Sequence, residues 1–244
     1  MNRKLSVGLL ILVFVLSACS RPQEMEFVRG SGAIASEARA IEGVRGVTLA
    51  TLGELIIELG EDEGLTIEAE ENLLPYLETT VRGGMLTIGS REGVSLSPSE
   101  TVTYYLTVTG LDSLAVSSSG NIEAPPLGGE RFTVESSSSG DIHVQGVNAE
   151  RLDVKIDSSG DIVVDGGQVG HEEIRIHSSG AFNADDVQCE SANVEITSSG
   201  NARIWVRDSL DADLSSSGDL NYYGEPEVSQ STSSSGQLIS MGGR

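Results

Sequence analysis

In the second half of the chain, apolar and polar residues alternate, and the alternation restarts after each copy of a Ser-Ser-Gly triplet. Counted from the glycine of each triplet, positions −6, −4 and +2 are mostly Val, Ile or Leu, whereas position −5 is mostly charged. A period of two with β-branched residues at the apolar positions predicts short strands that bury one face. The glycines of the triplets are Gly120, Gly140, Gly160, Gly180, Gly200, Gly218 and Gly236.

The spacing of the triplets predicts how these strands are arranged. The glycines are 20 residues apart four times and then 18 residues apart twice, with no helical pattern between them. A fixed period of this length is typical of a solenoid, because one repeat cannot bury its apolar face alone whereas strands stacked at about 4.8 Å can. The sequence therefore predicts an all-β fold, a single-stranded parallel β-helix with 18–20 residues per turn. The crossover rule for parallel strands favours a right-handed coil by analogy.

The triplet itself is expected to form a corner of each turn. Positions −2 and 0 are always Ser and Gly, which would point small residues inward, and glycine tolerates a bend that other residues resist. Buried serine hydroxyls would have to bond along their column or to the backbone. The Asn or Asp that usually follows the glycine suits a turn because its side chain can bond its own backbone. Ala181 and Gln237 replace it in two copies, so those corners depart from the pattern.

The first half of the chain is also strand-like but less regular. We expect residues 31–110 to start the coil or to cap its N-terminal end, and residues 111–244 to form the regular repeats. Pro75 limits any helical turn in Glu71–Leu77 to a short piece. The expected strands are Gly46–Thr51, Glu54–Leu59, Gly64–Glu70, Met85–Ile88 and Thr101–Thr109.

The first 18 residues have the pattern of a secretory signal. Arg3 and Lys4 precede an apolar run, Leu5–Leu16, which is too short to span a bilayer. The box Leu16-Ser17-Ala18-Cys19 resembles that of bacterial lipoproteins, in which Cys19 would be acylated with fatty acids such as palmitate and become the new N-terminus. Residues 19–30 would then be the lipidated cysteine and a tether. The alternative is an ordinary secretory signal with an accidental cysteine.

Charge and cysteine content fit an exported protein. The formal net charge is −22, and cleavage would remove Arg3 and Lys4 and make it more negative. So acidic a chain repels nucleic acid and offers no basic stripe to bind it. If Cys19 is acylated, Cys189 has no partner for a disulfide and is expected to be a small buried residue.

Two arrangements could carry chemistry if equivalent positions stack. Asp157, His177 and Thr197 would be neighbours in the order of an acid, a base and a hydroxyl, but strands about 4.8 Å apart are too widely spaced for direct proton transfer. Asp141 and Asp161 would stack and could hold a hard cation, but only two adjacent turns offer Asp, so turn formation is the favoured explanation. His143, His171 and the run Glu61–Glu63 are interpreted as surface residues. No cofactor and no metal are predicted.

The repeated Ser-Ser-Gly-Asn/Asp-Ile phrase resembles the bacterial GIN-domain family of auto-transporter adhesin heads. Gly43–Leu49, Leu65–Ala69 and Gly84–Ile88 resemble it too, and the match runs from about Phe27 to the C-terminus. The resemblance implies a β-helical fold and a secreted or lipid-anchored protein, and it supplies no catalytic residues.

The sequence thus favours a lipid-anchored protein of the cell envelope, on its periplasmic or outer side. Its membrane contact would be the lipid, and its rigid surface would bind a glycan or another envelope protein without catalysis. A polysaccharide-degrading β-helix enzyme and a unit that assembles end to end are the alternatives.

Overall fold

The computed structural model describes residues 25–233 and 235–244. The predicted signal peptide, Cys19 and the beginning of the tether lie outside the described residues. Within the described part of the chain, no helix is long and apolar enough to cross a membrane.

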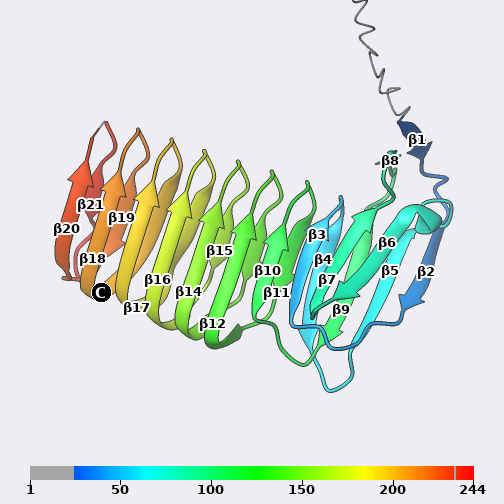
Figure 1. The fold of residues 1–244 in the computed structure, drawn as a ribbon, viewed down its shortest axis with the longest axis horizontal. Coiled ribbons are helices and arrows are strands. Elements are labelled where there is room, and N and C mark those ends of the chain that lie inside the picture. Colours follow the sequence, from blue (N-terminus) through cyan, green and yellow to red (C-terminus); the bar gives the residue numbers. More distant parts are fainter. Residues whose placement is uncertain (1–24, 234) are drawn as a thin grey trace, which may run out of the picture.

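The repeats form a coil of parallel strands (Figure 1). One side of the coil contains β10 (Ser113–Val116), β12 (Leu127–Ser136), β14 (Val147–Ile156), β16 (Gly167–Ile176) and β20 (Glu227–Thr232). The other side contains β11 (Asn121–Ala124), β13 (Ile142–Val144), β15 (Ile162–Val164), β19 (Leu220–Tyr223) and β21 (Leu238–Ser240). Two longer strands, β17 (Ala181–Ile196) and β18 (Asn201–Leu214), run through both sides. Every pairing between these turns is parallel, which confirms the predicted β-helix.

Equivalent positions of successive turns lie over one another, and this register builds the core. Val134 pairs with Val154, which pairs with Ile174, and the column continues through Val194 to Ala212. These five side chains are buried. Each fully buried aliphatic side chain contributes roughly 1.5–3 kcal/mol, so the stack supplies the stabilisation that a single turn lacks.

The first half of the chain supplies the first turns of the same coil. Its parallel strands are β3 (Gly46–Ala50), β4 (Glu54–Leu59), β7 (Met85–Ser90) and β9 (Thr103–Val108). Strand β3 lies between β10 and β7, and β4 lies between β11 and β9, all in parallel. The coil therefore extends beyond the Ser-Ser-Gly repeats.

Antiparallel strands cover this end of the coil (Figure 1). They are β2 (Ile34–Arg39), β5 (Gly64–Glu70) and β6 (Leu77–Arg82). Strand β5 pairs with β2 and β9, and β6 pairs with β7. The expected helical turn is a short 3-10 helix, Leu74–Tyr76, and β1 (Glu26–Arg29) forms a separate two-stranded parallel sheet with β8 (Val94–Ser97). The N-terminal part thus both starts the coil and caps it.

The final turn is much less buried than the others. All six residues of β20 are exposed, and Gln230 and Thr232 continue columns that are apolar in the preceding turns. A polar last turn ends the core without leaving a large apolar surface exposed to water.

Candidate binding surface

The corner glycines stack along one edge of the coil, the upper edge in Figure 1. None of the seven has a φ in the left-handed region, so the expected bend is not what requires glycine. The reason is close approach: a Cβ on Gly140 would lie 2.0 Å from the carbonyl oxygen of Gly120. A Cβ on Gly160 would lie 2.1 Å from the oxygen of Gly140. Any larger residue would therefore force neighbouring turns apart at this corner.

The serine at position −2 acts mainly through its backbone rather than as an inward-pointing side chain. Ser138 is half-buried, and its carbonyl oxygen accepts the N–H of Gly160 at 3.0 Å. The buried hydroxyl is that of Ser136, two residues earlier, which donates to the carbonyl of Gly140 at 3.1 Å. The corner is therefore held by bonds between turns and within them.

The side chain of the Asn or Asp that follows a corner glycine was expected to bond its own backbone, and this expectation is wrong. It accepts a backbone N–H from the next turn instead. The N–H of Asp141 donates to Oδ1 of Asn121 at 3.0 Å, and the N–H of Asp161 donates to Oδ1 of Asp141 at 2.8 Å. Ala181 breaks this ladder, and the N–H of Asn201 donates instead to the carbonyl of Gly180 at 3.3 Å. One side-chain oxygen per turn thus continues the backbone ladder around the corner.

This bonding leaves little support for a cation at Asp141 and Asp161. One oxygen of each carboxylate is already occupied by a backbone N–H. No group of three or more His, Cys, Asp or Glu side chains suited to a metal ion is present among residues 25–233 and 235–244. The two aspartates are accounted for by the corner.

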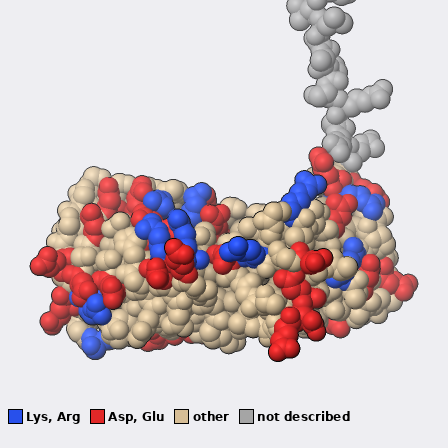
Figure 2. Space-filling model, turned by 60° about the horizontal axis from the view of Figure 1, so that its bottom comes forward, with Lys and Arg blue, Asp and Glu red and all other residues tan. Residues whose placement is uncertain are grey.

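Charged side chains form a lattice on the outer face of the coil, over β12, β14 and β16. We call Arg131, Arg151, Asp153, Glu173 and Arg175 the charge lattice. Asp153 lies between Arg131 and Arg151, at 2.6 Å and 3.0 Å, and Glu173 lies between Arg151 and Arg175, at 3.0 Å and 2.8 Å. Figure 2 shows Lys and Arg gathered in a cluster over the repeats with Asp and Glu beside it. Such networks link neighbouring turns more effectively than isolated surface pairs.

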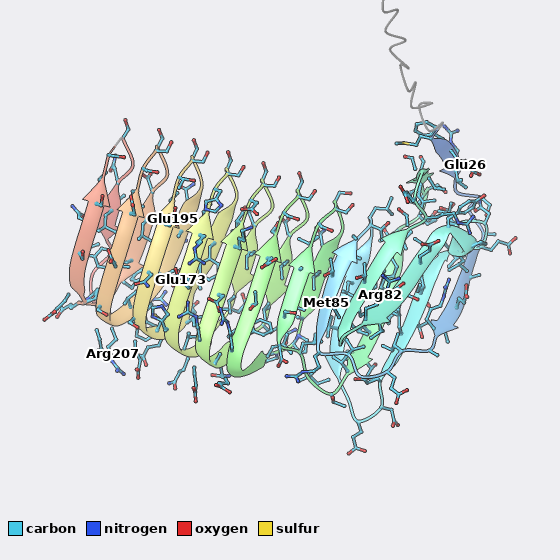
Figure 3. The ribbon with its side chains drawn as sticks, viewed as in Figure 1. Glu26, Arg82, Met85, Glu173, Glu195 and Arg207 are labelled. Carbon is cyan, nitrogen blue, oxygen red and sulfur yellow. The ribbon has the colours of Figure 1, made fainter. Side chains whose placement is uncertain are left out.

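The basic side chains of the lattice lower the pKa of Glu173, and in the described part of the chain the lattice does not continue to the next turn. Burial alone would raise the pKa of Glu173, but Arg175, Asn193 and Arg151 outweigh burial and lower it. Glu173 is therefore a fixed negative charge at neutral pH. Beyond it, Glu195 lies on the same face (Figure 3) and has no basic partner among the described residues.

Of the column Asp157, His177 and Thr197, which the structure describes in full, only the first two side chains share a hydrogen bond. Nδ1 of His177 lies 2.9 Å from Oδ1 of Asp157, closer than the strand spacing suggested, because side chains lean across the gap. The other oxygen of Asp157 pairs with Lys155 at 2.5 Å, and this hydrogen bond is the main reason why the pKa of Asp157 is lowered. No hydrogen bond joins Thr197 to His177 in the described structure, so a nucleophile activated by this histidine is absent there.

The remaining sequence candidates lie apart from one another. His143 lies between Glu123 and Asp165, 2.7 Å from each. Burial alone would lower the pKa of His143, but hydrogen bonds and charges from Asp165 and Glu123 raise it. His171 contacts the hydroxyl of Ser191 at 2.9 Å.

The acidic run Glu61–Glu63 and Cys189 both have structural roles. Oε1 of Glu63 accepts the N–H of Val44 at 3.0 Å and so ties a loop to the first turns. Cys189 is buried, as expected, and burial raises the pKa of its thiol, which makes it unreactive. Glu172 lies close to it inside the coil, fully buried and without a hydrogen-bond partner among the described residues.

A groove of about 610 Å³ follows the edge of the coil opposite the glycine corners. Three amides project along it from successive turns, and we call Asn148, Gln168 and Gln188 the amide ladder. Its other lining residues are Gly129, Ala149, Glu150, Val169, Gly170, Glu190 and Arg207. Figure 3 shows Arg207 projecting from this lower edge.

Comparison with known proteins gives the family. The family described as "Putative auto-transporter adhesin, head GIN domain" matches residues 45–226. The chain belongs to the GIN-domain family. No curated protein matches this sequence.

Solved structures of other bacterial proteins have the fold of this GIN domain. A "putative adhesin" from Parabacteroides merdae is 22% identical with a TM-score of 0.76, covering 88% of this chain and 99% of its own. One from Bacteroides fragilis is 16% identical with a TM-score of 0.78, covering 89% and 100%. A "putative lipid binding protein" from Parabacteroides distasonis is 24% identical with a TM-score of 0.70, covering 88% and 100%. At these identities the likeness shows the fold alone.

The groove of the GIN domain is the feature that sequence reasoning missed. Its signal was present: an amide occupies position +8 after Gly140, Gly160 and Gly180. The charge lattice was also missed, because the two pairs that connect its turns, Arg131–Asp153 and Arg151–Glu173, join adjacent strands and become visible only when the register is known. An adhesin family and an extended, rigid, polar surface both support a role in adhesion or binding.

Proposed function

We propose that this GIN domain is a lipid-anchored protein of the bacterial cell envelope that binds surface molecules and performs no catalysis. The observation that carries the proposal is the stacked register, which places equivalent outward positions over one another turn after turn on one rigid body. Solenoids of this kind offer long surfaces to partners that are themselves extended. A glycan or an extended segment of an envelope protein is such a partner.

The anchor in this proposal is a diacylated Cys19. The support is the Leu16-Ser17-Ala18-Cys19 box behind a basic start and a short apolar run, together with a family of adhesin heads, which act outside the cytoplasm. The chain between the cysteine and β1 would hold the coil away from the membrane. A strongly acidic surface favours solubility on such a tether and disfavours nucleic acid as a partner.

Labelled palmitate and cell fractionation test the anchor. The wild-type protein should incorporate the label and sediment with membranes, whereas Cys19→Ser should lose the label and become soluble. A Cys189→Ser variant is the matched control and should behave as wild type, since that thiol is buried. Equal labelling of Cys19→Ser and wild type would refute the anchor.

One observation favours an enzyme as the second candidate, namely the Asp157–His177 contact of 2.9 Å. The contact lies outside the groove and Lys155 also pairs with its acid, so a structural link between turns accounts for it better. Incubation of the purified protein with the glycans that it binds decides the matter. A binder leaves the chains intact, whereas release of shorter sugars that disappears with His177→Ala would establish the enzyme.

A further inference from the structure

The amide ladder offers hydrogen-bonding groups that the protein itself does not use. Oδ1 of Asn148 accepts the N–H of Gln168 at 3.1 Å, which leaves its NH₂ group available. The carboxamides of Gln168 and Gln188 have no partner among the described residues, and each provides two donors and one acceptor oxygen. Asn148 and Gln168 are exposed, and Gln188 is half-buried. The amide ladder therefore offers uncharged donors and acceptors to a ligand in the groove.

Small residues make this edge concave. Gly129 and Ala149 occupy equivalent positions of adjacent turns, and the buried residues Val169 and Cys189 continue their column in the next two turns. At one end the ladder begins beside Gly128, which has no side chain. At the other end, Gln188 pairs in register with Trp205. The guanidinium of Arg244 lies 5.8 Å from the centre of the Trp205 ring. The groove thus has a defined length of three amide rungs.

The spacing of the rungs selects the kind of polymer. Parallel strands place the rungs about 4.8 Å apart. A sugar unit in an extended β-linked chain, such as a β-1,4-glucan, has a similar length, so successive rings lie over successive amides. Neighbouring rings are turned over, and equivalent hydroxyl edges therefore return at every second rung, in step with the ladder. An extended peptide repeats on one side only every two residues, about 6.6 Å, and falls out of step with the ladder. Sugar hydroxyls both donate and accept, which matches carboxamides.

The charges around the groove select a neutral chain. Glu150 and Glu190 stand at its rim, and Arg207 pairs with Glu190 at 3.2 Å and with Asp208 at 2.8 Å. The basic group is therefore compensated, and the whole chain carries −22. An acidic polysaccharide would be repelled by the protein's own field.

We propose that the groove along Asn148, Gln168 and Gln188 binds a single extended, neutral, β-linked polysaccharide chain, one sugar per turn. The inference rests on the proposed binding function and names the site and the class of ligand. Only a few hydrogen bonds contribute at each rung, so binding of short fragments is weak and affinity increases with chain length.

Affinity electrophoresis of the full chain in mild detergent, through gels containing neutral β-linked glucans, mannans or xylans, tests the site. The wild type should be retarded by at least one polymer. Gln168→Ala and Gln188→Ala should each raise the dissociation constant about tenfold, since each removes hydrogen bonds to sugar hydroxyls. Gln145→Ala removes an exposed amide outside the groove and should bind as wild type. Thermal melting of each variant verifies that folding is unchanged.

Oligosaccharides of increasing length give a second readout. Affinity should rise up to about three sugars and then level off, since the ladder has three rungs and each turn holds one sugar. A protein that no neutral polymer retards, or groove variants that bind as wild type, would overturn the inference.

Capture of material from envelope extracts distinguishes a wrong binding site from a wrong proposed function. If wild type and groove variants capture the same envelope material while no polymer binds, the site is wrong and the binding role stands. If the protein captures nothing, or shortens the polymers, the binding role fails as well.

Discussion

Glu172 is a carboxyl group inside an otherwise apolar column, and its titration should control stability. It pairs in register with Leu152 on one side and Ala192 on the other. Its side chain is fully buried, and neither oxygen has a hydrogen-bond partner among the described residues. The nearby titratable group is the Cys189 thiol, whose raised pKa keeps it neutral at ordinary pH. Nothing near Glu172 therefore favours the charged form.

Burial raises the pKa of Glu172 from 4.5 to about 8. At about 1.4 kcal/mol per pKa unit this difference corresponds to about 5 kcal/mol between the two protonation states. Below pH 4.5 the carboxyl is neutral in both the folded and the unfolded chain, and the full stability is present. Between pH 4.5 and 8 only the unfolded chain ionises, so the free energy of unfolding falls by about 1.4 kcal/mol per pH unit. Above pH 8 the folded chain ionises as well and the dependence flattens.

The assay compares urea unfolding of the wild type and Glu172→Gln at intervals from pH 4 to pH 9. Glutamine has nearly the same shape and leaves an unpaired polar group in place, so the difference between the two proteins isolates the proton. The wild type should lose about 5 kcal/mol relative to Glu172→Gln across this range. Glu172→Leu should be more stable than wild type at pH 8, because it fills the column with an apolar side chain.

Parallel pH profiles for wild type and Glu172→Gln would refute this reasoning. They would mean that the carboxyl titrates normally in the folded state, and hence that it is hydrated or paired. A wild type that gains stability relative to Glu172→Gln as the pH rises would be a stronger contradiction.

Two substitutions and one titration test the corner and the surface. Gly160→Ala should lower the free energy of unfolding by about 2–4 kcal/mol, because its Cβ would lie 2.1 Å from the oxygen of Gly140. Ala181→Asn should raise it by about 0.5–1 kcal/mol, because its side-chain oxygen would accept the N–H of Asn201 as in other corners. The pKa of His143, measured by NMR, should exceed its ordinary value of 6.5, and the stability that His143 contributes should be full below pH 6.5 and lost as the pH rises through the folded-state pKa.

Matched controls accompany these changes. Ser159→Ala alters an exposed corner residue next to Gly160 and should be neutral. Ala181→Leu adds a side chain without an acceptor, and an equal gain in stability would contradict the hydrogen-bond explanation. A His143 pKa at or below 6.5 would mean that Glu123 and Asp165 do not contact the ring in solution.

The sequence predicted the coil because its signal is repeated. The triplets fix where each turn begins, and the apolar positions fix which side of each strand is buried, so the column from Val134 to Ala212 followed directly. The antiparallel strands β2 and β6 carry no such repetition, and their pairing depends on contacts distant in sequence. That they cap the coil while β3 and β4 start it could not be read from alternation alone.

The chemistry of individual positions was less predictable than their placement. The expectation for the residue after each glycine assumed a local turn. On a stacked corner, the next turn presents a free N–H group, and the side-chain oxygen accepts that one. Glu172 occupies position −8 before Gly180, an inward position by the period of two, but an acid there contradicts the apolar pattern of the column. The amide ladder was not predicted, because three amides 20 residues apart look like ordinary surface residues until the register places them side by side along a groove.

The central claim is that equivalent outer positions of successive turns stack at one strand spacing along a straight axis. Spin labels on cysteines introduced at the exposed corner residues Ser119 and Ser199, or Ser119 and Ser217, measure this directly in the full chain carrying Cys19→Ser. The account predicts distances near 19 Å for the first pair and 24 Å for the second, about 4.8 Å per turn, with narrow distributions. Equal distances for the two pairs, or broad distributions without this increment, would contradict it.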